Sequence, residues 1–442
     1  MAAGITAGTV AASAPVIYGV VRNMMPRPLG EHDYLHTENG CFYTRDGAML
    51  CLRGLNLNDE LFFFKKDGMD LPATNYDIFD AFEERFGRYG ARRLIQTYNE
   101  NFVSAADLKF LRKLGANCVR VPLRYRNLFR KENCKGDIDF DYLDTVIENC
   151  RKSGLYVILD LHSAPGYQNN DSASPRNGES ILFDSSKAAF EARNSVVRLW
   201  TQIASHYKDE PSIAAFDLLN RPLNKVANWK EKADTLNKFY LRLYKAIRTV
   251  DPDRILIMQS PHSVDELPAF DKPLENVAYG LYSRFSTTFE TDALIGSIRN
   301  IKERNIPVVI CKLRAEENAE YPLTSLCDCG VSWLYGDFKG TSGSNCLYTG
   351  NPDPADFDTD NFDAITEKWT KPLTSKNFTL NQELSAMLKS CFGYGYVTVS
   401  TPEREAENQK HKPKFKVGFG NNLIIGNHSP FRSAKLKVKK AK

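Results

Sequence analysis

Eight short apolar segments alternate with longer amphipathic ones along most of this chain, and this alternation constrains the fold more than any other feature. The segments between them have helical apolar spacing, for example 104–114, with Ser104 placed as its cap, 142–153, 186–207 and 229–250. Strands that are apolar on both faces are covered on both faces, so the pattern predicts an α/β fold, a (β/α)8 TIM barrel. The eight strand segments are 49–55, 116–123, 155–161, 213–219, 254–259, 277–282, 307–313 and 331–336.

Three regions are expected: an N-terminal arm over residues 1–38, the barrel over 39–400, and an extended basic tail over 401–442. A strand and turn at 40–47 lead into the barrel, and a helix at 378–391 is expected to close it. The uncharged run 5–21 is interrupted by Pro15, and no Lys or Arg precedes it, which argues against a secretory signal. An ordered arm is the favoured interpretation of this run, and a targeting segment stays open as the alternative.

The tail concentrates positive charge. Residues 401–442 contain eleven Lys and Arg against three Glu, a net charge of +8, whereas the whole chain has a net charge of +4. Such asymmetry suggests an arm that binds an acidic surface, with a solubilising disordered end as the alternative. Apolar residues interrupt the charge, and the residues expected to contact a partner are Lys414, Phe415, Lys416, Phe419, Ile424, Phe431 and Arg432.

The ten cysteines are scattered, and several, including Cys51, Cys118 and Cys311, lie inside apolar segments. This distribution is typical of reduced, buried thiols in an intracellular protein rather than of a disulfide framework. The Cys327-Asp-Cys329 spacing does not match a zinc knuckle, and no paired Cys/His set stands out. We therefore expect neither a metal nor a cofactor.

Motifs at the ends of the predicted strands resemble those of glycoside hydrolase family 5. They are Arg-Gly-Leu-Asn at 53–56, Asn-Cys-Val-Arg-Val-Pro at 117–122 and Leu-Asp-Leu-His-Ser-Ala-Pro-Gly at 159–166, the last being similar to the exo-glucanase branch. The resemblance covers about two thirds of the chain, from Gly40 to Phe338. It implies the barrel fold and an active site at the C-terminal ends of the strands.

The resemblance places eight family active-site residues on this chain, of which three are kept. The strand-two arginine is present as Arg120 and the strand-three histidine as His162. The asparagine that precedes the acid/base is present as Asn220. The acid/base position itself holds Arg221, and the nucleophile position holds Lys312. The histidine and tyrosine expected on strand six fall at Tyr282 and Arg284, and the strand-eight tryptophan falls at Gly336.

These substitutions remove the chemistry that the family implies. A retaining glycosidase needs two carboxyl groups about 5–5.5 Å apart, one as acid and one as nucleophile, whereas Arg221 and Lys312 are cations. The carboxylates that remain near strand ends are Asp217, Asp337, Glu316 and Glu317. Strand alternation predicts that Asp217 faces away from Asn220 and from the barrel mouth, and Glu316 and Glu317 fall in a loop. The sequence therefore predicts a catalytically inactive barrel.

The cations at the mouth leave two interpretations open. Arg120, Arg221, Arg284 and Lys312 are candidates for an anion-binding site. The alternative, which we favour, is that they pair with neighbouring carboxylates such as Asp217, Asp337 or Glu60 and fill the cleft.

The functional expectation is a structural barrel, tied by its terminal arms into a larger intracellular, cytoplasmic assembly. A microtubule lattice of the cytoskeleton or a cilium is an acidic host of this kind; a ribosome or other nucleoprotein particle ranks behind it, because the chain contains no nucleic-acid motif. The alternatives are carbohydrate binding without cleavage, through Arg120, His162 and Asn220, and an unrelated activity of the basic pocket.

Overall fold

The computed structural model describes residues 27–57, 64–65, 75–129, 136–171, 180–261, 266–302, 305–315, 319–341, 343, 345–356 and 358–392. The tail residues named above, and Glu60, Glu316 and Glu317, lie outside these residues.

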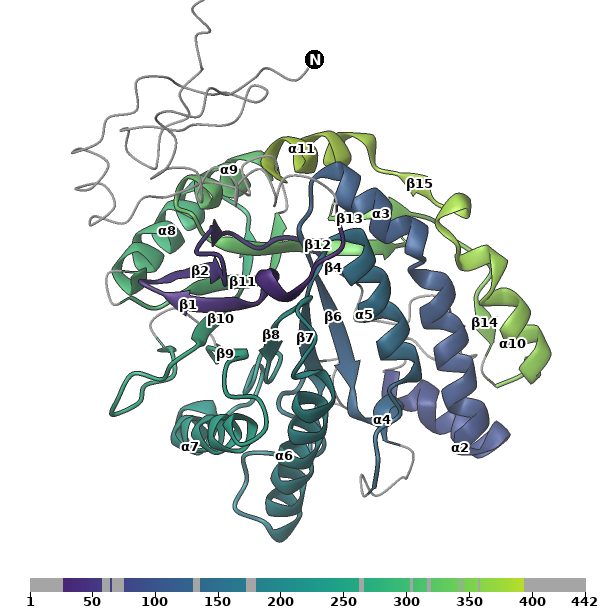
Figure 1. Ribbon diagram of the computed structural model, residues 1–442. Helices are drawn as coiled ribbons and strands as arrows, with labels where there is room; N and C mark the ends of the chain where they lie inside the picture. Colours follow the sequence, from purple (N-terminus) through teal and green to yellow (C-terminus); the bar gives the residue numbers. More distant parts are fainter. Residues whose placement is uncertain are drawn as a thin grey trace, which may run out of the picture.

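Eight parallel strands close into the predicted barrel (Figure 1). Each neighbour pair is hydrogen-bonded in chain order, and pairing of β11 with β12 and of β12 with β4 closes the ring. All eight predicted strand segments are confirmed, except that the first divides into β3 (Met49–Leu50) and the barrel strand β4. The barrel strands are β4 (Arg53–Asn56), β6 (Cys118–Arg124), β7 (Tyr156–Ser163), β8 (Ile213–Asp217), β9 (Ile255–Gln259), β10 (Val277–Phe285), β11 (Val308–Ala315) and β12 (Ser332–Gly340).

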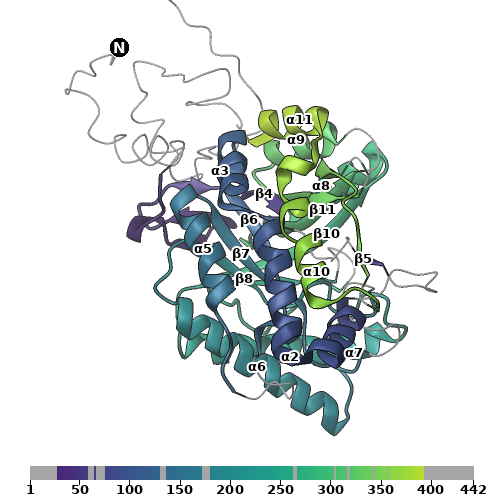
Figure 2. The same ribbon diagram turned by 90° about the vertical axis from the view of Figure 1, so that its right-hand side faces the viewer.

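Helices surround the strands and bury their apolar sides against them (Figures 1 and 2). Ser104 caps α3 as predicted, because its hydroxyl accepts a hydrogen bond from the Asp107 backbone N–H while the Asp107 carboxylate accepts one from the Ser104 N–H. No described helix combines the length and apolar character that a membrane span requires. The helices are α2 (Asn75–Phe102), α3 (Ala105–Leu114), α4 (Tyr125–Leu128), α5 (Asp141–Ser153), α6 (Lys187–Tyr207), α7 (Trp229–Arg248), α8 (Thr288–Lys302), α9 (Glu320–Asp328), α10 (Phe362–Lys368) and α11 (Gln382–Phe392).

A small antiparallel sheet covers the N-terminal end of the barrel. It consists of β1 (Leu35–Glu38), β2 (Cys41–Thr44) and β3, preceded by the 3-10 helix η1 (Glu31–Asp33). Leu29 and Leu35 pack with Phe42 and the lower interior side chains of the barrel. Residues 27–38, which we expected to belong to an arm, are therefore integral to the barrel body.

A second apolar cluster lies outside the barrel and was not foreseen. In it, α2 packs against α10 and the 3-10 helix η3 (Lys371–Leu373), with Phe82 and Tyr98 edge-on to Trp369. The remaining short elements are β5 (Phe64–Lys65), β13 (Cys346–Thr349), β14 (Ala355–Asp356), β15 (Thr379–Leu380) and η4 (Ser375–Asn377). β13 pairs with β12 and extends the sheet beyond the closed ring.

Alternation along the strands sorts the barrel interior into layers. Cys118, Ile158, Ala215 and Ile257 form an apolar lower layer. Two residues further along the same four strands stand Arg120, Asp160, Asp217 and Gln259. Because side chains two apart in a strand share a face, these four polar residues form the next layer, directly below the strand ends.

Candidate functional site

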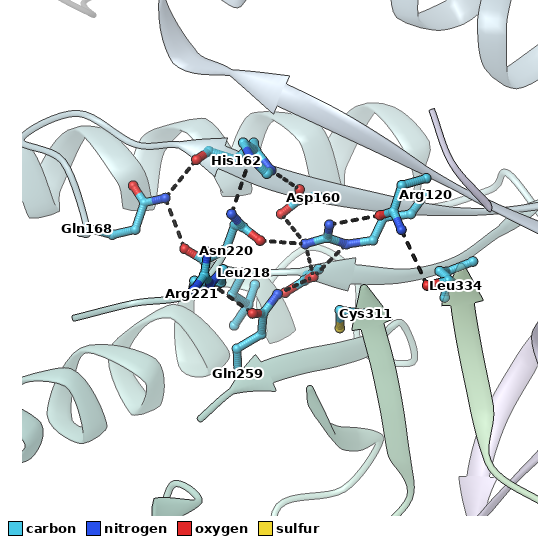
Figure 3. A network of polar contacts seen from close by, with 12 residues as sticks. Arg120, Asp160, His162, Gln168, Leu218, Asn220, Arg221, Gln259, Cys311 and Leu334 are labelled. Carbon is cyan, nitrogen blue, oxygen red and sulfur yellow. Dashed lines mark hydrogen bonds and ion pairs between the residues drawn. The ribbon is translucent and has the colours of Figure 1, made fainter. Parts of the chain in front are cut away.

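A buried guanidinium stands at the centre of the polar layer (Figure 3). Arg120 Nη2 lies 2.7 Å from Asp217 Oδ2 and 2.8 Å from Asp160 Oδ1. Gln259 Nε2 donates to the same Asp217 oxygen at 2.7 Å. Arg120 also donates to Asn56 Oδ1 at 3.1 Å, so one arginine ties together strands β4, β6, β7 and β8.

The position of Asp217 corrects the sequence interpretation. Its carboxylate faces the barrel axis, and the arginine that it binds also donates from Nη2 to Asn220 Oδ1 at 3.1 Å. Alternation failed here because β8 ends at Asp217, so the rule does not extend to Asn220. Burial raises the pKa of Asp217 to about 6, with Arg120 opposing the shift and Asp160 adding to it.

Arg120 keeps its charge in this environment. Burial acts against the cation, but the adjoining carboxylates of Asp160 and Asp217 outweigh it and raise the pKa of the guanidinium. Arg120 is therefore a permanent cation whose charge is matched inside the protein.

The three retained family residues meet in one network. His162 Nδ1 lies 2.6 Å from Asp160 Oδ2, and its Nε2 lies 3.3 Å from Asn220 Nδ2. Since an amide nitrogen only donates, this contact assigns the His162 proton to Nδ1, which then donates to Asp160. Gln168 Nε2 holds the same strand ends by donating to His162 O at 2.7 Å and to Asn220 O at 3.1 Å.

Arg221, which the sequence motifs predict at the acid/base position, is held in a strained backbone conformation with φ of +45°. Its backbone N–H donates to Gln259 Oε1 at 2.9 Å. Its guanidinium Nη1 lies 2.9 Å from Asp171 Oδ2, and its Cζ lies 4.1 Å from the centre of the Tyr282 ring. Asp171 also pairs with Lys225 at 3.3 Å, so the charge at the acid/base position is shared within a local ion-pair group.

Lys312, which the sequence motifs predict at the nucleophile position, is buried where β11 is irregular. Ile310 and Leu313 both pack outward against the helices, so Cys311 and Lys312 between them break the two-residue alternation. Lys312 Nζ lies 2.8 Å from Asp337 Oδ1, and Arg314 pairs with the other oxygen of the same carboxylate. The cation at this position is therefore neutralised by a resident aspartate.

Gly336, which the sequence motifs predict at the position of the family's tryptophan, has no room for a side chain. Its φ is +27°, and a Cβ built there would lie 2.0 Å from the carbonyl oxygen of Asn345. Asn345 is fixed in turn, because its side-chain amide exchanges hydrogen bonds with the Ala315 backbone N–H and C=O at 2.9 and 3.0 Å. Asn345, directly before β13, therefore occupies the space beside Gly336.

The predicted cations do not gather as one open group. Arg120 and Lys312 are buried against aspartates, Arg221 is paired with Asp171, and Arg284 is exposed on β10. The interpretation that the cations pair with neighbouring carboxylates holds for Arg120, which binds Asp217, and for Lys312, which binds Asp337. Within the described residues, His, Cys, Asp and Glu side chains do not form a group of three suited to a metal ion.

Several residues of the site were missed in the sequence. Asp160 stands two residues before His162 in a strand, so alternation placed both on one face and was an available signal. Gln259, at the end of β9, had the same kind of signal. Asp171 lies in irregular chain after β7 and had none.

Comparisons with known proteins identify the family of this barrel. The family described as cellulase (glycosyl hydrolase family 5) matches residues 80–321. A beta-xylosidase of Phanerodontia chrysosporium is 31% identical over 258 residues, which cover 56% of this chain and 51% of that protein. A glucan 1,3-beta-glucosidase of Candida oleophila is 29% identical over 191 residues, covering 42% of each chain.

A solved endogalactoceramidase structure, 17% identical, superposes with a TM-score of 0.52 over 78% of this chain and 84% of that one, which supports the fold alone. The chain spans about half the length, or less, of the curated relatives that it matches. The family match extends over more than half of the chain and includes the strand ends at which Arg120, His162 and Asn220 meet. The chain belongs to the cellulase family, glycosyl hydrolase family 5.

Proposed function

We propose that this chain is a non-catalytic member of its family, a barrel that serves as a structural subunit of a larger assembly. The proposed absence of catalysis rests on one observation. At the two predicted catalytic positions, Arg221 pairs with Asp171 and Lys312 pairs with Asp337. The family's mechanism requires an acid at one position and an anionic nucleophile at the other.

Electrostatics oppose any residual reaction at these positions. The sugar ring gains positive charge in the transition state, and a unit charge about 5 Å away contributes about 3 kcal/mol at an effective dielectric constant near 20. Replacing one carboxylate by one cation therefore raises the barrier by about twice that amount, or roughly four to five decades in rate. Neutralisation by Asp171 and Asp337 reduces this repulsion but supplies neither an acid nor a nucleophile.

Hydrolysis assays test the loss of catalysis. Aryl β-glucosides, aryl β-xylosides and a β-1,3-glucan are incubated with the full chain, with an active family 5 enzyme as the positive control. We expect a rate equal to the enzyme-free blank. Release of reducing ends that disappears in Arg221→Ala or Lys312→Ala would refute the proposal, because it would make these residues part of a working site.

The structural role is supported by the composition of residues 401–442, whose net charge of +8 favours an acidic partner surface. We propose that this segment anchors the barrel to an acidic protein lattice of the microtubule kind. Co-sedimentation with microtubules at low and high salt tests it, comparing the full chain with a variant in which Lys435, Lys437, Lys439 and Lys440 are changed to Gln. Salt-sensitive binding that the variant loses supports the proposal; binding to ribosomes instead, or equal binding by the variant, contradicts it.

Non-hydrolytic sugar binding is the second candidate, because Arg120, His162 and Asn220 are held together as a network. Stacking on an aromatic ring supplies much of the affinity for sugars, and Gly336 excludes a side chain at the family's aromatic position. Titration calorimetry with β-1,3- and β-1,4-gluco-oligosaccharides separates the two candidates. Heat that Asn220→Ala abolishes would favour sugar binding.

A further inference from the structure

Two cysteines meet an arginine on the outer side of the barrel, at the strand ends opposite the site described above. Cys327 lies on α9 and Cys391 on α11, two helices that lie side by side in both views (Figures 1 and 2). Arg53 begins β4 and Trp333 stands near the start of β12, beneath these helices. Both thiols are nearly buried, with Cys327 4% and Cys391 3% exposed.

Arg53 is an incompletely satisfied buried cation. Its side chain is fully buried, and Nη1 donates to the Cys391 backbone carbonyl at 3.2 Å. Nε and Nη2 have no hydrogen-bond partner, and no carboxylate among the described residues forms an ion pair with it. Asp328, next to Cys327 in the sequence, interacts with Arg53 electrostatically. A buried guanidinium without an ion-pair partner is nevertheless costly, so the environment of Arg53 favours further negative charge nearby.

Cys327 lies beside this cation, at the same backbone carbonyl. Its thiol donates to the Cys391 carbonyl oxygen at 3.7 Å, the oxygen to which Arg53 also donates. A hydrogen bond with the Cys391 thiol lowers the pKa of Cys327 to about 7; burial opposes this shift, and Arg53 and Trp333 add to it. The same hydrogen bond, together with burial, raises the pKa of Cys391. One thiol of the pair is thus an activated nucleophile and the other a protonated neighbour.

We propose that Cys327 and Cys391 form a redox-active thiol pair that a peroxide oxidises to a disulfide. The Cys327 thiolate attacks one peroxide oxygen, the O–O bond breaks, and hydroxide leaves, which gives a sulfenic acid at Cys327. The Cys391 sulfur then attacks the sulfenic sulfur, the S–S bond forms, and the second hydroxide leaves. The protons of the two thiols convert both hydroxides to water, so two thiols and one hydrogen peroxide give one disulfide and two waters.

This bond would fasten α11 covalently to α9. α11 is the last element that the structure describes before the basic segment 401–442. Oxidation would therefore fix the helix from which that segment continues, and reduction would release it.

The experiment uses the full chain. It is treated with hydrogen peroxide near pH 7, denatured in the presence of a thiol-capping reagent, digested, and examined by mass spectrometry. We expect a cross-linked peptide that contains Cys327 and Cys391 and that a reductant separates. Arg53→Met is expected to slow the reaction at least about tenfold, because the thiolate fraction falls with the loss of the cation, whereas Arg53→Lys keeps the charge and stays closer to the wild type.

The proposal can be tested without the arginine variants, in case these do not fold. Cys391→Ser removes the resolving thiol, so a sulfenic acid that a cyclic diketone probe traps at Cys327 supports the proposed order of steps. Two free thiols after peroxide treatment of the wild type would overturn the proposal. A disulfide between Cys327 and Cys329 would overturn it as well, and so would an equal rate in a folded Arg53→Met variant.

Discussion

Lys312 Nζ lies 2.8 Å from Asp337 Oδ1, and each of the two side chains is only 4% exposed. The sequence motifs predict the family's nucleophile at Lys312, and this position is part of the protein's electrostatic framework. Replacing Lys312 tests how far that framework depends on it.

Lys312→Glu is expected to destabilise the protein by about 3–5 kcal/mol, because it sets a second buried carboxylate against Asp337. Lys312→Met is expected to cost less, about 1–3 kcal/mol, since Arg314 still pairs with Asp337. Urea unfolding of both variants measures the difference. Recovery of stability in the charge-swapped double variant, Lys312→Glu with Asp337→Lys, would confirm the ion pair; equal losses in the two single variants would contradict it.

Arg120→Met is expected to lower the free energy of unfolding by about 3–5 kcal/mol at neutral pH, because it leaves Asp160 and Asp217 buried without their cation. The loss should shrink toward pH 4, because burial already raises the pKa of Asp217 and its carboxylate can take up a proton there. Arg120→Lys keeps the charge and serves as the matched control. Denaturation of the three proteins at several pH values checks this, and a loss independent of pH would point to packing instead.

Because of Lys339, we expect the free energy of unfolding to rise with pH in alkaline solution. Burial lowers its pKa from 10.5 to about 8, and its Nζ donates to the Leu373 carbonyl at 2.7 Å and also to Phe102 O. Between these pH values the unfolded lysine holds a proton that the folded one has lost, so stability increases with pH, by at most about 3 kcal/mol.

Lys339→Met removes the titrating amine and should remove this rise. The measurement is the difference in unfolding free energy between wild type and variant, followed from pH 7 to 10.5, since other groups contribute alike to both proteins. A constant difference across the range would show that the amine titrates normally.

Gly336→Ala is expected to destabilise the protein by more than about 2 kcal/mol, because the new Cβ meets the Asn345 carbonyl in addition to the positive φ. Gly343→Ala is the matched control, since Gly343 also has a positive φ but no atom within 4 Å of its Cβ position. Thermal unfolding compares the two. Equal shifts would mean that the backbone conformation alone, and not the approach of Asn345, governs Gly336.

The barrel was predictable because each strand is apolar on both sides and each helix has a regular apolar face. Motifs at the strand ends predict that Arg221 and Lys312 stand at the family's catalytic positions, and this assignment stays a prediction. Their partners were not: Asp171 lies in irregular chain, and Lys312 sits where β11 departs from alternation. The packing of α2 against α10 was not predicted either, because the apolar spacing of a helix does not show which other element it packs against.

The ion pairs of Arg221 and Lys312 bear on whether the proposed loss of hydrolysis could be reversed. A glutamate placed at either position would stand against Asp171 or Asp337, the carboxylates that now pair with the two cations. Under the proposed function, a return to activity would therefore require the neighbouring aspartates to be accommodated as well as the two glutamates restored.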